Sequence, residues 1–117
     1  RVLNLAGTTG GATLDASGAG ALVFTSALTA TGAGAKTLTL AGASTADNTL
    51  AGAIVNNSAA NPTSVRKTGA GTWVLSGANT FTGGLSVDEG VLRLGADGAL
   101  ADTLALTLNG GTLAVSG

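Results

Sequence analysis

The stretch Gly71-Thr-Trp-Val-Leu-Ser-Gly-Ala-Asn-Thr-Phe-Thr-Gly-Gly-Leu-Ser-Val-Asp-Glu-Gly-Val-Leu-Arg-Leu-Gly95 decides the fold of this chain. Its short runs alternate apolar and polar residues, as strands with one buried face do, and glycine or asparagine interrupts them. The five-residue pattern apolar-x-apolar-small-Gly ends at Gly7, Gly42, Gly77 and Gly117. The first two spacings between successive copies are equal, and the third is slightly longer. Recurrence on this scale is typical of stacked repeats, in which each unit completes its core only against its neighbours.

Alternating residues predict the strands, and their apolar members are expected to point inward, among them Leu3, Leu38 and Trp73. No window has helical periodicity, and 20 glycines together with many threonines disfavour helix. We therefore predict an all-β parallel β-solenoid of about six coils with no substantial helix. The expected strands cover residues 2–6, 21–25, 36–41, 49–55, 72–76, 85–87, 91–94, 103–108 and 112–115.

A β-sandwich is the competing architecture, because short strands separated by turn signals also describe it. Residues 104–115 could form a hairpin around Asn109-Gly110, since Asn-Gly is a strong hairpin signal. The recurrence favours the solenoid, because a sandwich has no reason to repeat its sequence. Residues 56–64, which hold the only proline, are predicted to be an irregular loop.

Composition excludes several classes of function. Charged residues make up 9% of the chain and the net charge is −1, so nothing favours nucleic acid or an anionic membrane as a partner. The absence of Cys and His excludes a catalytic thiol, a His general base and a Cys-based zinc site. No apolar run reaches the roughly 18 residues of a spanning helix, so no membrane insertion of this segment is expected. Residues 1–117 are expected to be one solenoid segment of a longer repeat array.

No constellation of residues predicts an active site, a metal or a cofactor. The acidic residues are expected to be solvated, mostly in turns, and no calcium or phosphate motif is present. Paired threonines suggest an ice-binding interpretation, but their spacings share no period. Trp73 is expected in the core, whereas Phe81 stands among turn residues. The acids are Asp15, Asp47, Asp88, Glu89, Asp97 and Asp102.

Residues 69–95 resemble the autotransporter-associated β-strand repeat, also called the passenger-associated transport repeat, of Gram-negative autotransporter passenger domains. Residues 36–50 resemble the same element more distantly, and Phe81 stands where the family often has Tyr. The residues that carry the motif are Gly71, Thr72, Trp73, Leu75, Gly77, Asn79, Thr80, Phe81, Gly83, Gly84, Val87, Gly90, Leu92, Leu94 and Gly95.

The resemblance implies a right-handed parallel β-helix at the bacterial cell surface, outside the cell, with a supporting part in passenger export and display and no catalytic residue. The first hypothesis is a structural stalk or display module of an adhesin-type surface protein. The alternative is a self-assembling filament subunit that stacks head to tail through uncapped solenoid ends. Expected partners are flanking repeats of the same chain or further copies of it, and surface components of a host cell or biofilm are considered as well.

Overall fold

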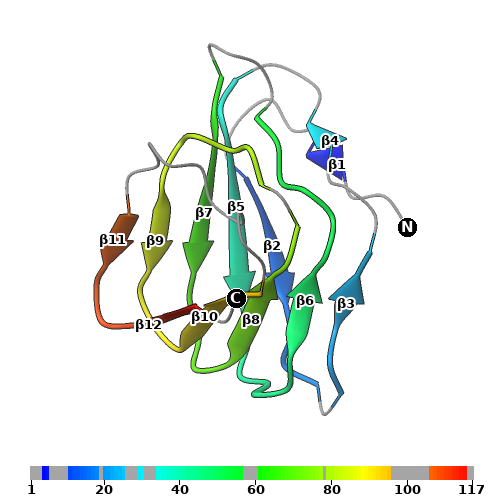
Figure 1. Cartoon of the computed structure of the whole chain (residues 1–117), viewed down its shortest axis with the longest axis vertical. Coiled ribbons are helices and arrows are strands. Elements are labelled where there is room, and N and C mark those ends of the chain that lie inside the picture. The colour runs from blue at the N-terminus through cyan, green and yellow to red at the C-terminus, as the bar shows by residue number, and fades with distance from the viewer. Residues whose placement is uncertain are drawn as a thin grey trace.

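The computed structural model describes residues 4–5, 11–18, 20–25, 29–30, 34–56, 61–77, 79–95 and 106–115. Every regular element within these ranges is a β-strand, and every strand pairing is parallel (Figure 1). The predicted all-β parallel β-solenoid is therefore confirmed.

Two five-stranded sheets form the body of the solenoid, and the chain alternates between them. The first sheet is ordered β11-β9-β7-β5-β2 and the second β12-β10-β8-β6-β3, so strands that are neighbours in a sheet are separated in sequence by one coil. The first sheet contains β2 (Gly11–Asp15), β5 (Lys36–Ala41), β7 (Thr63–Lys67), β9 (Leu85–Val87) and β11 (Leu106–Leu108). The second contains β3 (Val23–Phe24), β6 (Asn48–Leu50), β8 (Thr72–Leu75), β10 (Val91–Leu94) and β12 (Thr112–Val115). A short third sheet pairs β1 (Asn4–Leu5) with β4 (Thr29–Ala30).

The register shows that the coils differ in length. Along one row of the first sheet the successive partners are Ala12, Leu38, Val65, Leu85 and Leu106, and the first two steps are longer than the last two. All four steps lie near the short end of the roughly 20–45 residues that structural repeats take. The prediction of about six coils is not confirmed, because each large sheet has five strands among the described residues.

The recurrence in the sequence is explained only in part by this register. Trp73 pairs with Leu92, and Leu92 pairs with Leu113, so the step from Gly77 to Gly117 corresponds to two coils of the second sheet. The step from Gly42 to Gly77 is not a stacking period, because the strand before Gly42 is β5 of the first sheet and the strand before Gly77 is β8 of the second. Both strands need inward apolar residues followed by a tight turn, so similar local sequences arise in different sheets.

The sandwich and hairpin alternatives are wrong. β11 pairs with β9 and β12 with β10, both in parallel, so Asn109-Gly110-Gly111 connects two sheets and does not join two paired strands. The amide of Gly111 donates to the carbonyl of Val87 at 3.3 Å, which ties this turn to the preceding coil.

Strand positions agree with prediction where alternation is clean. The strands expected at 36–41, 85–87, 91–94 and 112–115 have those bounds, while the second-sheet strands expected at 21–25, 49–55 and 72–76 are shorter or shifted. Three strands were missed: β2, β4 and β7. The loop predicted at 56–64 is wrong over its last two residues, which begin β7, and residues 57–60 lie outside the described part of the chain.

The core lies between the two large sheets and is built mostly from their inward side chains, with Ala16, Ile54 and Phe81 added by the connections. Leu38 is 1% exposed and Trp73 is fully buried, which confirms their predicted inward direction; Leu3 lies outside the described residues. At the edge strand β11, the inward-row residues Leu106 and Leu108 are 45% and 53% exposed. The buried apolar cluster comprises Ala16, Leu38, Leu40, Leu50, Ile54, Val65, Trp73, Leu75, Phe81, Leu85, Val87, Leu92 and Leu94.

Candidate functional site

The motif residues predicted from the sequence lie mostly in the interior. Six of them, Trp73, Leu75, Phe81, Val87, Leu92 and Leu94, belong to the buried cluster. Phe81 is 1% exposed, so its placement among turn residues understated its role in packing. Thr80 is exposed, Thr72 is half-buried, and Asn79 is buried. The motif therefore brings together packing and turn residues.

Gly90 turns the chain from the first sheet to the second and cannot carry a side chain there. Its φ is +69°, in the left-handed region that favours glycine. A Cβ at this position would lie 2.4 Å from the carbonyl oxygen of Gly71 and 2.5 Å from that of Gly69. The corners of successive coils are thus stacked in backbone contact.

Asparagine side chains bind the backbones of neighbouring coils. Asn48 is fully buried; its Oδ1 accepts from the amide of Leu22 at 2.9 Å, and its Nδ2 donates to the carbonyls of Ser44 at 3.1 Å and Thr72 at 2.8 Å. The Oδ1 of Asn79 accepts from the amide of Ile54 at 2.8 Å. These bonds give the amides of Leu22 and Ile54, and the carbonyls of Ser44 and Thr72, a side-chain partner from an asparagine. Asn79 belongs to the motif predicted from the sequence. Asn48 was not predicted, although it lies two residues before the inward Leu50.

Two lysines lie inside the solenoid. Lys36 is 2% exposed and Lys67 is fully buried. The Nζ of Lys67 donates to the carbonyl oxygens of Thr68 at 2.6 Å, Gly69 at 2.9 Å and Glu89 at 3.4 Å, which belong to two successive coils. Burial lowers the pKa of Lys67, and the charge of Glu89 partly opposes this. Neither buried lysine was predicted from the sequence, although Lys67 lies two residues after the inward Val65 on the same face of β7.

Charged side chains on the outside form two ion pairs within the described part of the chain. The Nε of Arg66 donates to Asp88 Oδ2 at 2.6 Å, and Arg93 Nη1 donates to Asp47 Oδ1 at 3.2 Å. Asp88 also accepts from Asn109 Nδ2 at 2.9 Å, and the bonds from Asn109 and then Arg66 lower its pKa.

Two of the predicted turn acids lie in a turn of the described part of the chain. Asp88 and Glu89 lie between β9 and β10, as expected of turn residues. No group of three or more His, Cys, Asp or Glu side chains is placed to hold a metal among the described residues. Asp97 and Asp102 lie outside them.

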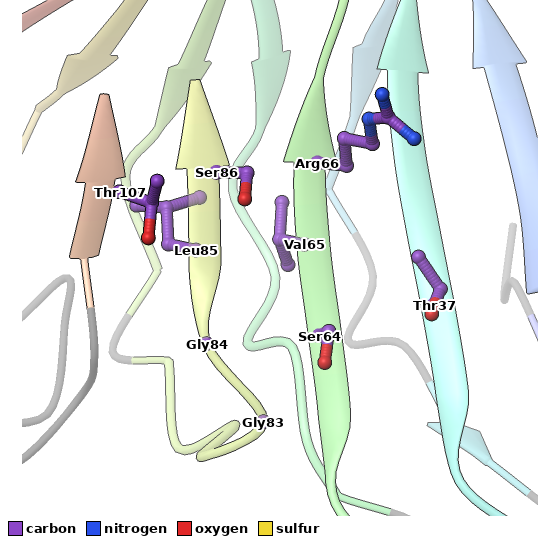
Figure 2. Close-up of a pocket in the computed structure, with 9 residues that line it drawn as sticks. All are labelled: Thr37, Ser64, Val65, Arg66, Gly83, Gly84, Leu85, Ser86 and Thr107. Atoms are coloured by element: carbon purple, nitrogen blue, oxygen red, sulfur yellow. The ribbon is translucent and has the colours of Figure 1, made fainter. Parts of the chain in front are cut away.

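The outer face of the first sheet contains a hollow of about 260 Å³, which is the candidate functional site (Figure 2). It crosses β5, β7, β9 and β11. The register places Thr37 beside Ser64, Arg66 beside Ser86, and Ser86 beside Thr107. The residues that line it are Thr37, Ser64, Val65, Arg66, Gly83, Gly84, Leu85, Ser86 and Thr107.

Glycine and serine in adjacent coils shape one end of this hollow. Gly83 approaches β7 so closely that a Cβ on it would lie 2.4 Å from Ser64 Oγ. Its amide donates to the carbonyl of Thr63 at 2.9 Å, and the amide of Val65 donates to the carbonyl of Gly84 at 3.0 Å. Because Gly83 and Gly84 have no side chains, the row that starts with Thr37 and Ser64 does not continue, and the surface is open there.

The fold and this site define a class of protein: a repeat-built parallel β-solenoid whose sequence motif serves packing and turning. Residues 65–94 match the passenger-associated transport repeat, which confirms the resemblance that the sequence predicted. The match runs from β7 to β10 and so includes two strands of each large sheet.

One relative is an autotransporter. The chain is 42% identical over 88 residues to the adhesin BmaC autotransporter of Brucella suis biovar 1 (strain 1330). The alignment covers 73% of this chain and 2% of that much longer protein. No solved structure matches the chain significantly. Among the described residues, no helix has the length and apolar character needed to cross a membrane.

Proposed function

We propose that this chain is a segment of a non-enzymatic β-helical stalk or display module in an extracellular, autotransporter-like adhesin of the bacterial cell surface. The observation that carries the proposal is the passenger-associated transport repeat at residues 65–94 within a parallel solenoid. The similarity to an autotransporter adhesin over 73% of the chain supports the same conclusion. Right-handed winding belongs to the proposal, with support from the family resemblance.

The physical basis is that each coil extends the body while its own surface stays free to vary. Strands in a sheet are about 4.8 Å apart, and every added coil hydrogen-bonds to the one before it. The longer coils that join β2, β5 and β7 stack in register with the shorter coils that join β7, β9 and β11, so the difference in length lies in the connections. A stalk can therefore present different loops on one continuous core.

Surface display tests the proposal. The whole chain would be inserted between two epitope tags in the passenger of an autotransporter that lacks adhesion activity. We expect both tags to reach the cell surface and the segment between them to resist trypsin. The matched control carries Leu75→Asp, which puts a charge at a fully buried position and should leave the segment sensitive to protease. Retention of the native segment inside the cell, or equal sensitivity of both versions, would contradict the proposal.

The non-enzymatic part is tested separately. Purified chain should release no product above background from polysaccharide, ester or peptide substrates. Hydrolysis that disappears when two acids near one cleft are replaced would show a catalytic site instead.

The filament subunit stays the alternative, favoured by the exposed inward row of β11. Leu106 and Leu108 continue the rows of Leu85 and Val87 but have no further strand over them in the described structure. Another copy could pair with this edge and cover them. Sedimentation over a concentration series distinguishes the two: growth into open-ended assemblies supports the filament, and a monomer at high concentration supports the stalk.

A further inference from the structure

We infer that the hollow on the outer face of the first sheet binds an acidic glycan, with Arg66 as the group that recognises its carboxylate or sulfate. The inference rests on the proposed display role and deepens it by giving one face of the solenoid a ligand class. It depends on four features of the described residues: the shape of the hollow, its hydroxyl groups, the position of Arg66, and the absence of aromatic side chains from its lining.

The shape fits a chain that lies across the strands. The lining residues come from four consecutive strands of the sheet, β5, β7, β9 and β11. Three intervals of about 4.8 Å give a length of roughly 14 Å. An extended oligosaccharide has this form, whereas a compact metabolite would use a deeper pocket enclosed on most sides.

The lining offers hydroxyl groups to a polyhydroxylated ligand. Ser64 and Ser86 come from neighbouring strands, and Thr37 and Thr107 lie at the two ends of the hollow (Figure 2). A hydroxyl can donate and accept a hydrogen bond, which suits the hydroxyl groups of sugars. Without an aromatic ring the hollow cannot stack on the apolar face of a sugar, so the affinity has to come from hydrogen bonds and charge.

Arg66 supplies the charge. Among the described residues it is the only cationic side chain that lines the hollow, and 58% of its side chain is exposed. Asp88 holds the Nε of Arg66 at 2.6 Å, which fixes the guanidinium and leaves its two Nη groups to bind a ligand. A guanidinium in this position can donate two parallel hydrogen bonds to a carboxylate or sulfate.

The nearby carboxylate of Asp88 keeps its negative charge, but its hydrogen-bond donors come from within the protein. Its Oδ2 accepts from Arg66 and its Oδ1 accepts from Asn109 at 2.9 Å, so both oxygens already have donors. The two other cations nearest in sequence to the site, Lys36 and Lys67, are buried and face the opposite side of the sheet. Recognition of an anionic group at this surface therefore depends on Arg66.

Titration calorimetry with the purified whole chain tests the inference. The probes are a heparin-derived oligosaccharide, which carries sulfates, an oligogalacturonate, which carries carboxylates, and a neutral malto-oligosaccharide of equal length. We expect at least one acidic probe to bind with an affinity that falls as salt rises, and the neutral probe to bind more weakly. Which acidic probe binds more tightly identifies the anionic group.

Variants locate the binding. Arg66→Gln should weaken the acidic probe at least about tenfold, the loss of one charge-assisted contact. Arg93→Gln is the matched control, because Arg93 also projects from a strand and pairs with an aspartate, but in the second sheet. It should change the affinity less than about twofold. Arg66→Lys keeps the charge but not the two parallel donors, so its affinity for the acidic probe should lie between those of the other two variants. It replaces Arg66→Gln in the test if that variant fails to fold.

Three results would overturn the inference: no binding of either acidic probe, binding of the neutral probe with equal affinity, or equal losses in Arg66→Gln and Arg93→Gln. None of them would affect the proposed display role, because the export assay does not depend on a ligand.

Discussion

The inward faces of the two large sheets are built differently. In the second sheet the inward residues Trp73, Leu75, Leu92 and Leu94 are at most 8% exposed, and Asn48 is the only polar side chain buried among the described residues of its strands. In the first sheet the buried residues of β5 and β7 include Lys36, Thr63 and Lys67 beside Leu38, Leu40 and Val65. One sheet thus supplies an apolar wall, and the other combines apolar rows with buried donors.

The difference shows how backbone carbonyls at the corners of a solenoid with few charged residues obtain hydrogen-bond donors. Lys67 pairs with Leu40 on one neighbouring strand and with Val87 on the other. Its Nζ extends beyond this inward row of side chains and donates to carbonyl oxygens of two successive coils. Buried carbonyls without donors are costly, and a long cationic side chain serves several of them at once. Not every polar group is served: Thr63 Oγ1 has no hydrogen-bond partner among the described residues.

The largest effect is expected in the apolar wall. Trp73→Ala should lower the free energy of unfolding by about 3–5 kcal/mol, because it removes the largest buried side chain and leaves a cavity. It also removes the bond from Trp73 Nε1 to the carbonyl of Ala41 at 3.1 Å, which joins the two sheets. Urea denaturation measures the change.

The control for Trp73 is Thr72→Ala on the same strand, a half-buried residue that should cost no more than about 0.5 kcal/mol. Equal losses at the two positions would mean that the faces of β8 are assigned wrongly.

The corner between the sheets should be nearly as sensitive. Gly90→Ala should cost about 2–3 kcal/mol, because the left-handed backbone is strained for alanine and the new Cβ would collide with two carbonyl oxygens. Gly20→Ala is the matched control, since a Cβ there meets nothing within 4 Å and should leave urea midpoints unchanged. A tolerated Gly90→Ala would show that the corners are not stacked this closely.

Lys67 tests the polar inward row of the first sheet. Lys67→Met keeps most of the side-chain stem but removes the donors to Thr68, Gly69 and Glu89. We expect a loss of about 1–3 kcal/mol, the cost of leaving buried acceptors unsatisfied. The lowered pKa of Lys67 reports the opposing cost of burying its charge, which limits the loss.

Arg66→Met, one residue away on the outer face, should lose less stability than Lys67→Met in the same denaturation assay. A Lys67→Met variant that matches or exceeds the native stability would show that the hydrogen bonds from the buried ammonium to these carbonyls do not stabilise the fold.

Sequence alternation predicted the fold where inward residues are apolar. The strands at 36–41, 85–87, 91–94 and 112–115 were placed correctly because leucine and valine mark their inward faces. It failed at β7, whose inward row of Thr63, Val65 and Lys67 has one apolar member, and whose first two residues were assigned to a loop. The predicted number of coils is not confirmed either, and similar pentapeptides end strands in both sheets.

The candidate site could not be predicted from the sequence, for a different reason. The hollow combines Thr37, Ser64, Ser86 and Thr107, which are separated by one to three coils and are ordinary strand residues individually. Only the register of unequal coils brings them together with Arg66. The family motif was found because it is continuous in sequence.

The smallest effect concerns Asp88, on the outer side of the first sheet, and it appears as a dependence on pH. Hydrogen bonds from Asn109 and then Arg66 lower the pKa of this carboxyl below its ordinary value of 3.8. The unfolded chain therefore binds a proton more readily than the folded one, so the contribution to stability is present above about pH 4 and is lost as the pH falls through the folded pKa.

Urea midpoints measured from pH 6 to pH 2 should fall less steeply below pH 4 in Asp88→Asn than in the native chain. Asn109→Ala should remove part of the same slope, because it deletes the donor with the largest influence. Identical acid profiles for the native chain and Asp88→Asn would show that the outer side chains of the first sheet, unlike its buried lysine, contribute nothing to holding the coils together.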